Sequence, residues 1–418
     1  MLPEEWTQMA RYAVYVRTLY NRLAAPLSSK HISSDSWRII RRDFTDRPIL
    51  PNLRVLDWTA GEANTDFAAL VAFLSPSLKD LTIDCAVGAV RNGTPSGLEE
   101  GWIAQMTNLV SELSKRVPAL VSLSVICNNL SPGIVIQPLS LRHPPSLRRL
   151  SLAAYYNARL GLEGLKAMSC FTTVESLTLS LAFADIPQTD LPSRIELNSL
   201  VSLRLSSSTR DVGIKPVYDI IASPNLRELH IGNAHCAGDA AFRRMSAAWA
   251  RSFPSLEVLD CWVAFADVEP PPEPCSSLSS LLRPLSGLRR MREVTVFLCC
   301  VPIVLDDNDL LAFAQAWPSL EKLHLGSTET YSSSLGISLL GLLSLSTYCP
   351  NLSSLKLHHL VLRPEDIAQL PLERSCPPHG LRMLEVKSGL SPEMYEVVRD
   401  RVFPNLHRFI APQELYDR

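Results

Sequence analysis

The chain has 418 residues, of which 46% are hydrophobic and 20% are charged, and its 42 acidic and 40 basic residues give a net charge of −2. This composition excludes general disorder, and the near-neutral charge gives no bulk attraction to nucleic acid or to an anionic membrane. Residues 1–6 are acidic without an apolar stretch, and the most apolar run, residues 335–345, is too short to cross a bilayer. We expect neither nucleic-acid nor membrane binding, and a location in the cytoplasm or the nucleus.

The first 50 residues predict a helix that runs into a short strand, over residues 6–19. Further on, the polar cluster at residues 33–36 precedes Trp37 and predicts the N-terminal cap of a second helix running towards Phe44. We interpret residues 1–50 as an N-terminal helical cap that includes a first, atypical copy of the unit described next.

From residue 51 onwards, one short pattern recurs to the end of the chain. It reads Pro, then Asn or Ser, then Leu-x-x-Leu-x-apolar, as at residues 224–231. Its first apolar residue falls at positions 53, 78, 120, 147, 174, 200, 226, 256, 291, 320, 352, 381 and 406, a mean spacing of about 29. Two copies are weak, because the one at Val174 lacks the proline and the one at Met291 is recognisable only by its register.

The physics of this unit predicts one architecture. In Leu-x-Leu the side chains alternate, so both leucines enter the core and the residue between them faces outwards. Proline suits the entry to a short strand, and a helix supplies the crossover that brings the next strand in parallel. Because one unit cannot bury its apolar face alone, neighbours must stack. We therefore predict an α/β leucine-rich-repeat solenoid of about 13 units over residues 51–418, curved, with parallel strands on its concave face and helices on its convex face.

The segments between the repeats predict the crossover helices. In chain order these are residues 67–74, 98–116, 160–168, 217–222, 240–253, 310–317, 337–348 and 392–402. The proline-rich residues 269–274 cannot form regular structure and predict a surface loop.

The sequence contains none of the short motifs that indicate the common classes of enzyme. A phosphate loop, a metalloprotease helix and a nucleophile elbow are all missing. The ten cysteines have no paired Cys-x-x-Cys spacing and favour buried reduced thiols. The adjacent pairs His358-His359 and Cys299-Cys300 are poor metal sites, because neighbours on a strand point to opposite faces.

A hydrolytic triad is the one catalytic arrangement that the repeats offer. His230 and Asp260 fall at equivalent positions of adjacent repeats, and Ser202 lies one repeat earlier. An open strand surface, however, provides neither water exclusion nor an oxyanion hole. We therefore expect no enzymatic activity, no cofactor and no bound metal.

The irregular period and the Pro-Asn/Ser-Leu openings resemble the leucine-rich-repeat half of F-box proteins, especially the large fungal group. The likeness is carried by Tyr-Ala-Val-Tyr-Val-Arg-Thr-Leu at residues 12–19 and by residues 47–58 and 73–78. It implies that the repeats hold a protein substrate while a short helical F-box docks on the adaptor of a cullin-based ubiquitin ligase. The F-box expected before Trp6 is missing, so we expect adaptor binding only if one is restored upstream.

The predicted function is a non-catalytic, monomeric scaffold that binds a protein substrate on the concave face for an F-box-type (SCF) ubiquitin ligase. On that face the central positions are small and hydroxylic at first and charged from Arg204 onwards, and Trp and Arg are the residue types that carry interface energy. The predicted partner-binding residues are Arg204, Glu228, His230, Asp260, Trp262, Lys322, His324, Lys356, His358, Glu385 and Lys387.

An alternative stays open. The chain could be a leucine-rich-repeat regulator or inhibitor of another enzyme, with no link to ubiquitination. Such regulators resemble more regular repeats with Asn or Cys after the strand, a feature that this sequence keeps poorly.

Overall fold

The computed structural model describes residues 3–21, 48–59, 67–85, 96–128, 132–155, 159–183, 194–207, 220–265, 277–299, 305–327, 336–357, 360, 379–386 and 392–410. The chain divides into two compact units, residues 1–212 and residues 213–418, and each is described by itself. Three predictions lie outside the described residues. These are the helix near residues 37–44, the loop at residues 269–274, and the placement of His358 and Lys387.

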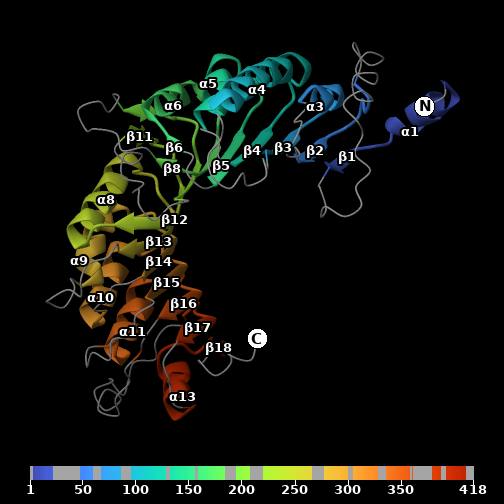
Figure 1. Ribbon diagram of the computed structural model, residues 1–418. Coiled ribbons are helices and arrows are strands. Elements are labelled where there is room, and N and C mark those ends of the chain that lie inside the picture. Colours follow the sequence, from blue (N-terminus) through green and yellow to red (C-terminus); the bar gives the residue numbers. More distant parts are fainter. Residues whose placement is uncertain are drawn as a thin grey trace. The chain divides into compact units, whose positions relative to one another are not determined.

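The first unit is built on a parallel sheet whose strands follow chain order. Its strands are β1 (Thr18–Asn21), β2 (Val55–Thr59), β3 (Asp80–Cys85), β4 (Ser122–Asn128), β5 (Arg149–Tyr155), β7 (Ser176–Ser180) and β10 (Ser202–Ser206). The helices are α1 (Pro3–Ala13), α3 (Phe67–Phe73), α4 (Ser96–Arg116), α5 (Gly133–Leu141), α6 (Leu162–Ala167) and the 3-10 turn η1 (Met168–Cys170). Helices α3 to α6 form one layer on a single face of this sheet (Figure 1).

Short strands supplement the main sheet of the first unit. β6 (Arg159–Leu160) pairs in parallel with β8 (Ala182–Phe183), and β9 (Ile195–Glu196) precedes β10. The predicted N-terminal helix and strand are confirmed as α1 and β1, because Leu19 pairs with Leu56 in the same register as the later repeats.

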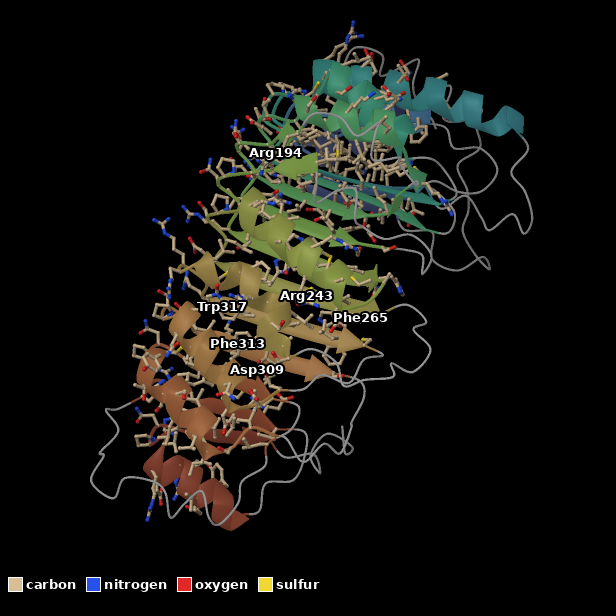
Figure 2. The ribbon with its side chains drawn as sticks, turned by 90° about the vertical axis from the view of Figure 1, so that its left-hand side faces the viewer. Arg194, Arg243, Phe265, Asp309, Phe313 and Trp317 are labelled. Atoms are coloured by element: carbon tan, nitrogen blue, oxygen red, sulfur yellow. The ribbon has the colours of Figure 1, made fainter. Side chains whose placement is uncertain are left out.

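The second unit repeats the same plan. After the short strand β11 (Ile221–Ala222), its parallel sheet contains β12 (Glu228–Cys236), β13 (Val258–Phe265), β14 (Glu293–Cys299), β15 (Lys322–Ser327), β16 (Ser354–Leu357), β17 (Met383–Val386) and β18 (Arg408–Ile410). The helices are α8 (Asp239–Ser252), α9 (Leu278–Leu282), η3 (Arg283–Gly287), α10 (Asp307–Ala316), α11 (Leu339–Tyr348) and α13 (Pro392–Arg401). Helices α8 to α11 lie side by side on one face of this sheet (Figures 1 and 2).

The leucine spacing sets the register of both sheets. Leu323 pairs with Val294 on one side and Leu355 on the other, and all three side chains are fully buried. The two weak copies of the pattern are confirmed as repeats, because Val174 and Met291 are 2% and 0% exposed. The predicted mixed α/β architecture, one parallel strand for each repeat and helices at the crossovers, is therefore confirmed.

Most predicted crossover helices are present, but three details differ. The helix expected over residues 217–222 ends by Ile220, and Ile221–Ala222 is a strand, as suits a β-branched residue in a short segment. Helix α5 was not predicted, because it begins after Pro132 and contains Pro138, two strong signals against a helix. Helix α9 was also missed, because it has only five residues.

Two carboxylates on α10 join it to both neighbouring helices. Asp309 is 1% exposed, and its Oδ1 accepts a hydrogen bond from the backbone N–H of Ser279 on α9 (3.0 Å). Asp307 accepts from the backbone N–H groups of Ser338 (2.7 Å) and Gly341 (3.2 Å) at the start of α11. The N-terminal N–H groups of a helix have no partner within it, so α10 caps both of its neighbours as well as itself.

A side chain at Gly341, one of the donors of the second cap, would force Asp307 to move. A Cβ on Gly341 would lie 2.5 Å from Oδ1 of Asp307. The missing side chain therefore allows the close approach between α11 and α10.

His379 is the clearest pH-sensitive group of the fold. It is 2% exposed, and Nε2 lies 2.7 Å from the carbonyl oxygen of Cys349 while Nδ1 accepts from the N–H of Leu381 at 3.1 Å. Both contacts are satisfied only by a neutral ring that carries its proton on Nε2. Burial lowers the pKa of His379 below its ordinary value of 6.5, against the opposing effect of the Cys349 carbonyl.

Acidification should therefore destabilise the second unit through His379. Between pH 6.5 and the lower pKa of His379 in the folded protein, the unfolded chain binds more protons than the folded chain. The contribution of His379 to the free energy of unfolding is therefore complete above this pH window and is lost as the pH falls through it. The expected slope is up to about 1.4 kcal/mol per pH unit. Urea unfolding at pH 7.5 and 5.5 should show a smaller acid loss for His379→Gln than for the unaltered protein. The control variant His407→Gln, at an exposed histidine, should lose as much stability on acidification as the unaltered protein. Equal losses in all three proteins would contradict this role of His379.

Candidate functional site

The second unit presents a strand surface that is covered by none of the described helices, which we call the open face. Along each strand the side chains alternate, with the leucines buried under the helices and the intervening residues on the other side. The described residues of the open face are Glu228, His230, Val258, Asp260, Trp262, Glu293, Thr295, Phe297, Lys322, His324, Gly326, Ser354, Lys356, Met383, Glu385 and Arg408.

Most of the predicted site residues are brought together on this face. His230, Asp260, Thr295, His324, Lys356 and Glu385 stand in one row across six adjacent strands, in the predicted order. Arg204 is exposed on β10 and belongs to the first unit, where it continues a row of small hydroxylic residues through Thr178 and Ser151.

Both described lysines of the open face are held by carboxylates. Lys322 Nζ lies 2.8 Å from Glu293 Oε1 on the adjacent strand, and Lys356 Nζ lies 2.8 Å from Glu385 Oε2. Partly exposed pairs of this kind contribute only about 0–1 kcal/mol each to stability, but they neutralise the charge of that part of the face.

His324 stands between these pairs and adds no charge at neutral pH. Its Nε2 lies 2.9 Å from Oγ of Ser354. Burial, together with the charge of Lys356, lowers the pKa of His324 below its ordinary value of 6.5.

An aromatic stack rises from the otherwise polar open face. The rings of Trp262 and Phe297 are stacked, with centroids 4.7 Å apart and planes inclined by 27°. Phe297 in turn lies over Gly326, the residue directly opposite it on β15. Trp262 remains 49% exposed, so a large apolar surface faces solvent among charged residues. Sequence reasoning identified Trp262 but missed Phe297, which stands two residues after Thr295 in the weakest repeat.

Gly326 should be required for this stack. A Cβ on Gly326 would lie 2.5 Å from Cδ2 and 2.8 Å from Cε2 of Phe297, so the ring must move. We expect Gly326→Ala to cost about 1–2 kcal/mol and to change the fluorescence of Trp262. Gly287→Ala is the matched control, because a Cβ there meets nothing within 4 Å. Urea unfolding followed by tryptophan emission measures both, and an unchanged spectrum for Gly326→Ala would contradict the stack.

The corner of the open face formed by β12 and β13 is acidic. His230 Nδ1 lies 3.4 Å from Oδ2 of Asp260, a long contact, while Oδ1 of Asp260 is screened from solvent and accepts no hydrogen bond from any described residue. Glu228 is exposed and stands opposite the apolar Val258. In the described part of the chain, no cation forms an ion pair with Glu228.

The groups that could perform covalent chemistry are poorly placed for it. Burial raises the pKa of Cys236 and of Cys349 to about 12 and that of Cys261 well above its ordinary value, so all three thiols stay protonated. Over the described ranges, no group of three or more His, Cys, Asp or Glu side chains is arranged to hold a metal ion. None of the described helices has the length and apolarity needed to cross a membrane.

A hollow of about 480 Å³ opens on the helix layer between η3 and α10. Phe313 and Trp317, labelled in Figure 2, form part of its wall. Its polar groups serve the fold, because Trp317 Nε1 donates to the carbonyl oxygen of Leu285 (3.2 Å) and Arg289 donates to that of Ala316 (3.3 Å). The open face is therefore the better candidate site.

Comparisons with known proteins do not identify a family for this chain. No protein-family model matches the chain, and no curated protein matches it. Among solved structures, 66 chains match. One belongs to the complex of Rad7 and Elc1 from yeast, with 16% identity over 97% of this chain and 92% of that one, at a TM-score of 0.43. A likeness this distant carries no weight for function.

Proposed function

We propose that the chain is a leucine-rich-repeat solenoid that binds a protein on the open face of its second unit, without catalysis, as the substrate-recognition part of an F-box-type ubiquitin ligase. The observation that carries the binding role is Trp262, half exposed and stacked on Phe297 in the middle of a polar surface. Exposed aromatic residues surrounded by polar ones are typical of the energetic centre of a protein interface.

The surroundings of the stack favour a macromolecular partner over a small molecule. A small ligand needs a concave site that buries most of its surface, whereas the open face is a row of strands whose side chains pair with one another. Solvent-exposed pairs such as Lys322 with Glu293 form the polar rim that surrounds an interface centre.

The ligase assignment depends on the sequence likeness to fungal F-box proteins at residues 12–19, 47–58 and 73–78. In the structure, Tyr12 and Ala13 end α1 and β1 begins at Thr18, so a helix is followed by a strand, but the strand is shorter than the likeness implies. Adaptor binding requires an F-box in addition to the residues described above.

Site-specific photo-crosslinking tests the binding role. The crosslinking residue p-benzoylphenylalanine is placed at Thr295 or Arg408 on the open face. As matched controls it is placed on the helix layer, at Arg243, which Figure 2 labels, or at Gln315 on α10. In the cells from which the sequence comes, we expect one protein to be crosslinked from both open-face positions and from neither control. Crosslinking of the same protein from the helix layer alone would contradict the proposal.

The fate of that protein separates the two functions. For a ligase receptor, we expect the crosslinked protein to have a longer half-life when this chain is deleted, measured after translation is stopped. For a regulator of another enzyme, the half-life stays the same and the activity of the crosslinked protein changes. An unchanged half-life would therefore remove the ligase link and leave the binding role in place.

A further inference from the structure

We infer that the acidic corner beside Trp262 receives a lysine or arginine side chain of the partner protein. The cation would lie against the outer ring face of Trp262, near the carboxylate of Asp260, with that of Glu228 further along β12. This inference rests on the proposed function and specifies the chemistry that the open face recognises.

One ring face of Trp262 is available to a ligand. Its other face is covered by Phe297, which stands directly opposite on β14. On the remaining side lies β12, where a bulge places Gly232 and Asn233 opposite Trp262, with Asn233 at a φ of 52°. Trp262 is 49% exposed although one ring face lies against Phe297, so the exposed part of the ring is on the side away from Phe297.

The charge around that ring face is negative. Asp260 precedes Trp262 by two residues on the same face of β13, about 7 Å along the strand. Its Oδ1 has no hydrogen-bond donor among the described residues, and its Oδ2 has only the 3.4 Å contact with His230. Glu228 adds a second, more distant carboxylate on β12, opposite Val258 and about 14 Å from Trp262. The charge of Asp260 is thus only partly compensated within the second unit.

The carboxylates of the open face on β14 and β17 differ from Asp260, because each forms an ion pair with a lysine. Glu293 is held by Lys322 and Glu385 by Lys356, both at 2.8 Å. These lysines stand on β15 and β16, and Lys322 is two strands across and four residues along from Trp262, about 16 Å away. The corner at β12 and β13 therefore combines uncompensated acids with an uncovered indole ring.

Such a corner selects for a cation by two physical effects. The negative face of an indole ring attracts an ammonium or guanidinium group, and the attraction strengthens as water is excluded. A nearby carboxylate attracts the same group and repels an acidic one. An apolar side chain would gain only the ring contact and would desolvate Asp260 without replacing its water.

Fluorine NMR of the full chain labelled with 5-fluorotryptophan tests this inference without knowledge of the partner. The Trp262→Phe variant identifies the signal of Trp262. The probes are three nine-residue peptides, made of three copies of Gly-Ser-Lys, Gly-Ser-Arg or Gly-Ser-Glu. We expect the lysine and arginine peptides to shift the Trp262 signal saturably at low ionic strength and the glutamate peptide to leave it unchanged.

A charge-matched variant provides the control. The double variant Asp260→Asn with Glu228→Gln should weaken binding of the basic peptides at least about tenfold. Glu175→Gln with Glu196→Gln changes the net charge equally on the first unit and should leave binding unchanged. The signals of the other tryptophans report whether each variant is folded.

Two results would overturn the inference. One is an equal response to the glutamate peptide, and the other is unaltered binding by the Asp260→Asn and Glu228→Gln variant. If either occurred while crosslinking from Thr295 and Arg408 succeeded, the cation site would fall and the protein-binding role would stand. If crosslinking failed while the basic peptides bound normally, the protein-binding role would fall and the cation site would stand.

Discussion

The Asp309→Ala variant should unfold with a free energy about 3 kcal/mol below that of the unaltered protein. The Asp309 side chain accepts hydrogen bonds from the backbone N–H groups of Ser279 (3.0 Å) and Asp306 (3.2 Å), and it is 1% exposed. Without the carboxylate, two N–H groups of the helix layer lose their acceptor where little water can replace it. Each orphaned donor costs about 1–3 kcal/mol.

A neighbouring residue on α10 provides the control for Asp309→Ala, and hydrogen exchange provides a local measurement. Asn308 lies next to Asp309 on α10 but is exposed, so Asn308→Ala should cost less than about 0.5 kcal/mol. Hydrogen exchange should show faster exchange of the Ser279 and Asp306 amides in Asp309→Ala, and urea unfolding gives the global value. Equal stability of the Asp309→Ala and Asn308→Ala variants would show that the cap between α9 and α10 contributes nothing.

The strands and their register could be predicted from the sequence because one physical rule fixes both. Leu-x-Leu sends two side chains to one face, and the spacing of about 29 residues leaves room for one crossover. The rule applies even at Met291, where only the register marks the repeat. Its side chain is fully buried, as the rule predicts. The crossovers are less predictable, because α5 forms although it contains Pro138.

The contacts between side chains of different repeats could not be predicted in the same way. Sequence reasoning placed Lys322 and Lys356 on the site as separate charges, but each lies within reach of a carboxylate on an adjacent strand. Changing Lys322 to glutamate would set two carboxylates opposite each other and disturb the sheet as well as any partner. Phe297 could have been found, because it stands at the same offset in its repeat as Trp262 does in the preceding one.

The difference between a paired lysine and an exposed aromatic ring decides which residue should dominate partner binding. Truncation of Lys322 removes one member of a partly exposed ion pair, which is worth about 0–1 kcal/mol. Truncation of Trp262 removes the one described tryptophan of the open face, together with the ring contact that Phe297 supports. Side chains of this type at the centre of an interface typically carry about 2–4 kcal/mol.

We therefore expect Trp262→Ala to weaken binding of the protein crosslinked from Thr295 and Arg408 by about 30- to 1,000-fold, and Lys322→Ala by no more than about fivefold. Trp262→Phe should lie between the two, because a smaller ring can still stack on Phe297. Since Trp262 is half buried against Phe297, its truncation should also lower the melting temperature modestly, and a thermal melt of each variant separates lost binding from lost folding. Titration calorimetry measures the affinities. Equal losses for Trp262→Ala and Lys322→Ala would mean that charge spread over the open face, and not the aromatic stack, holds the partner.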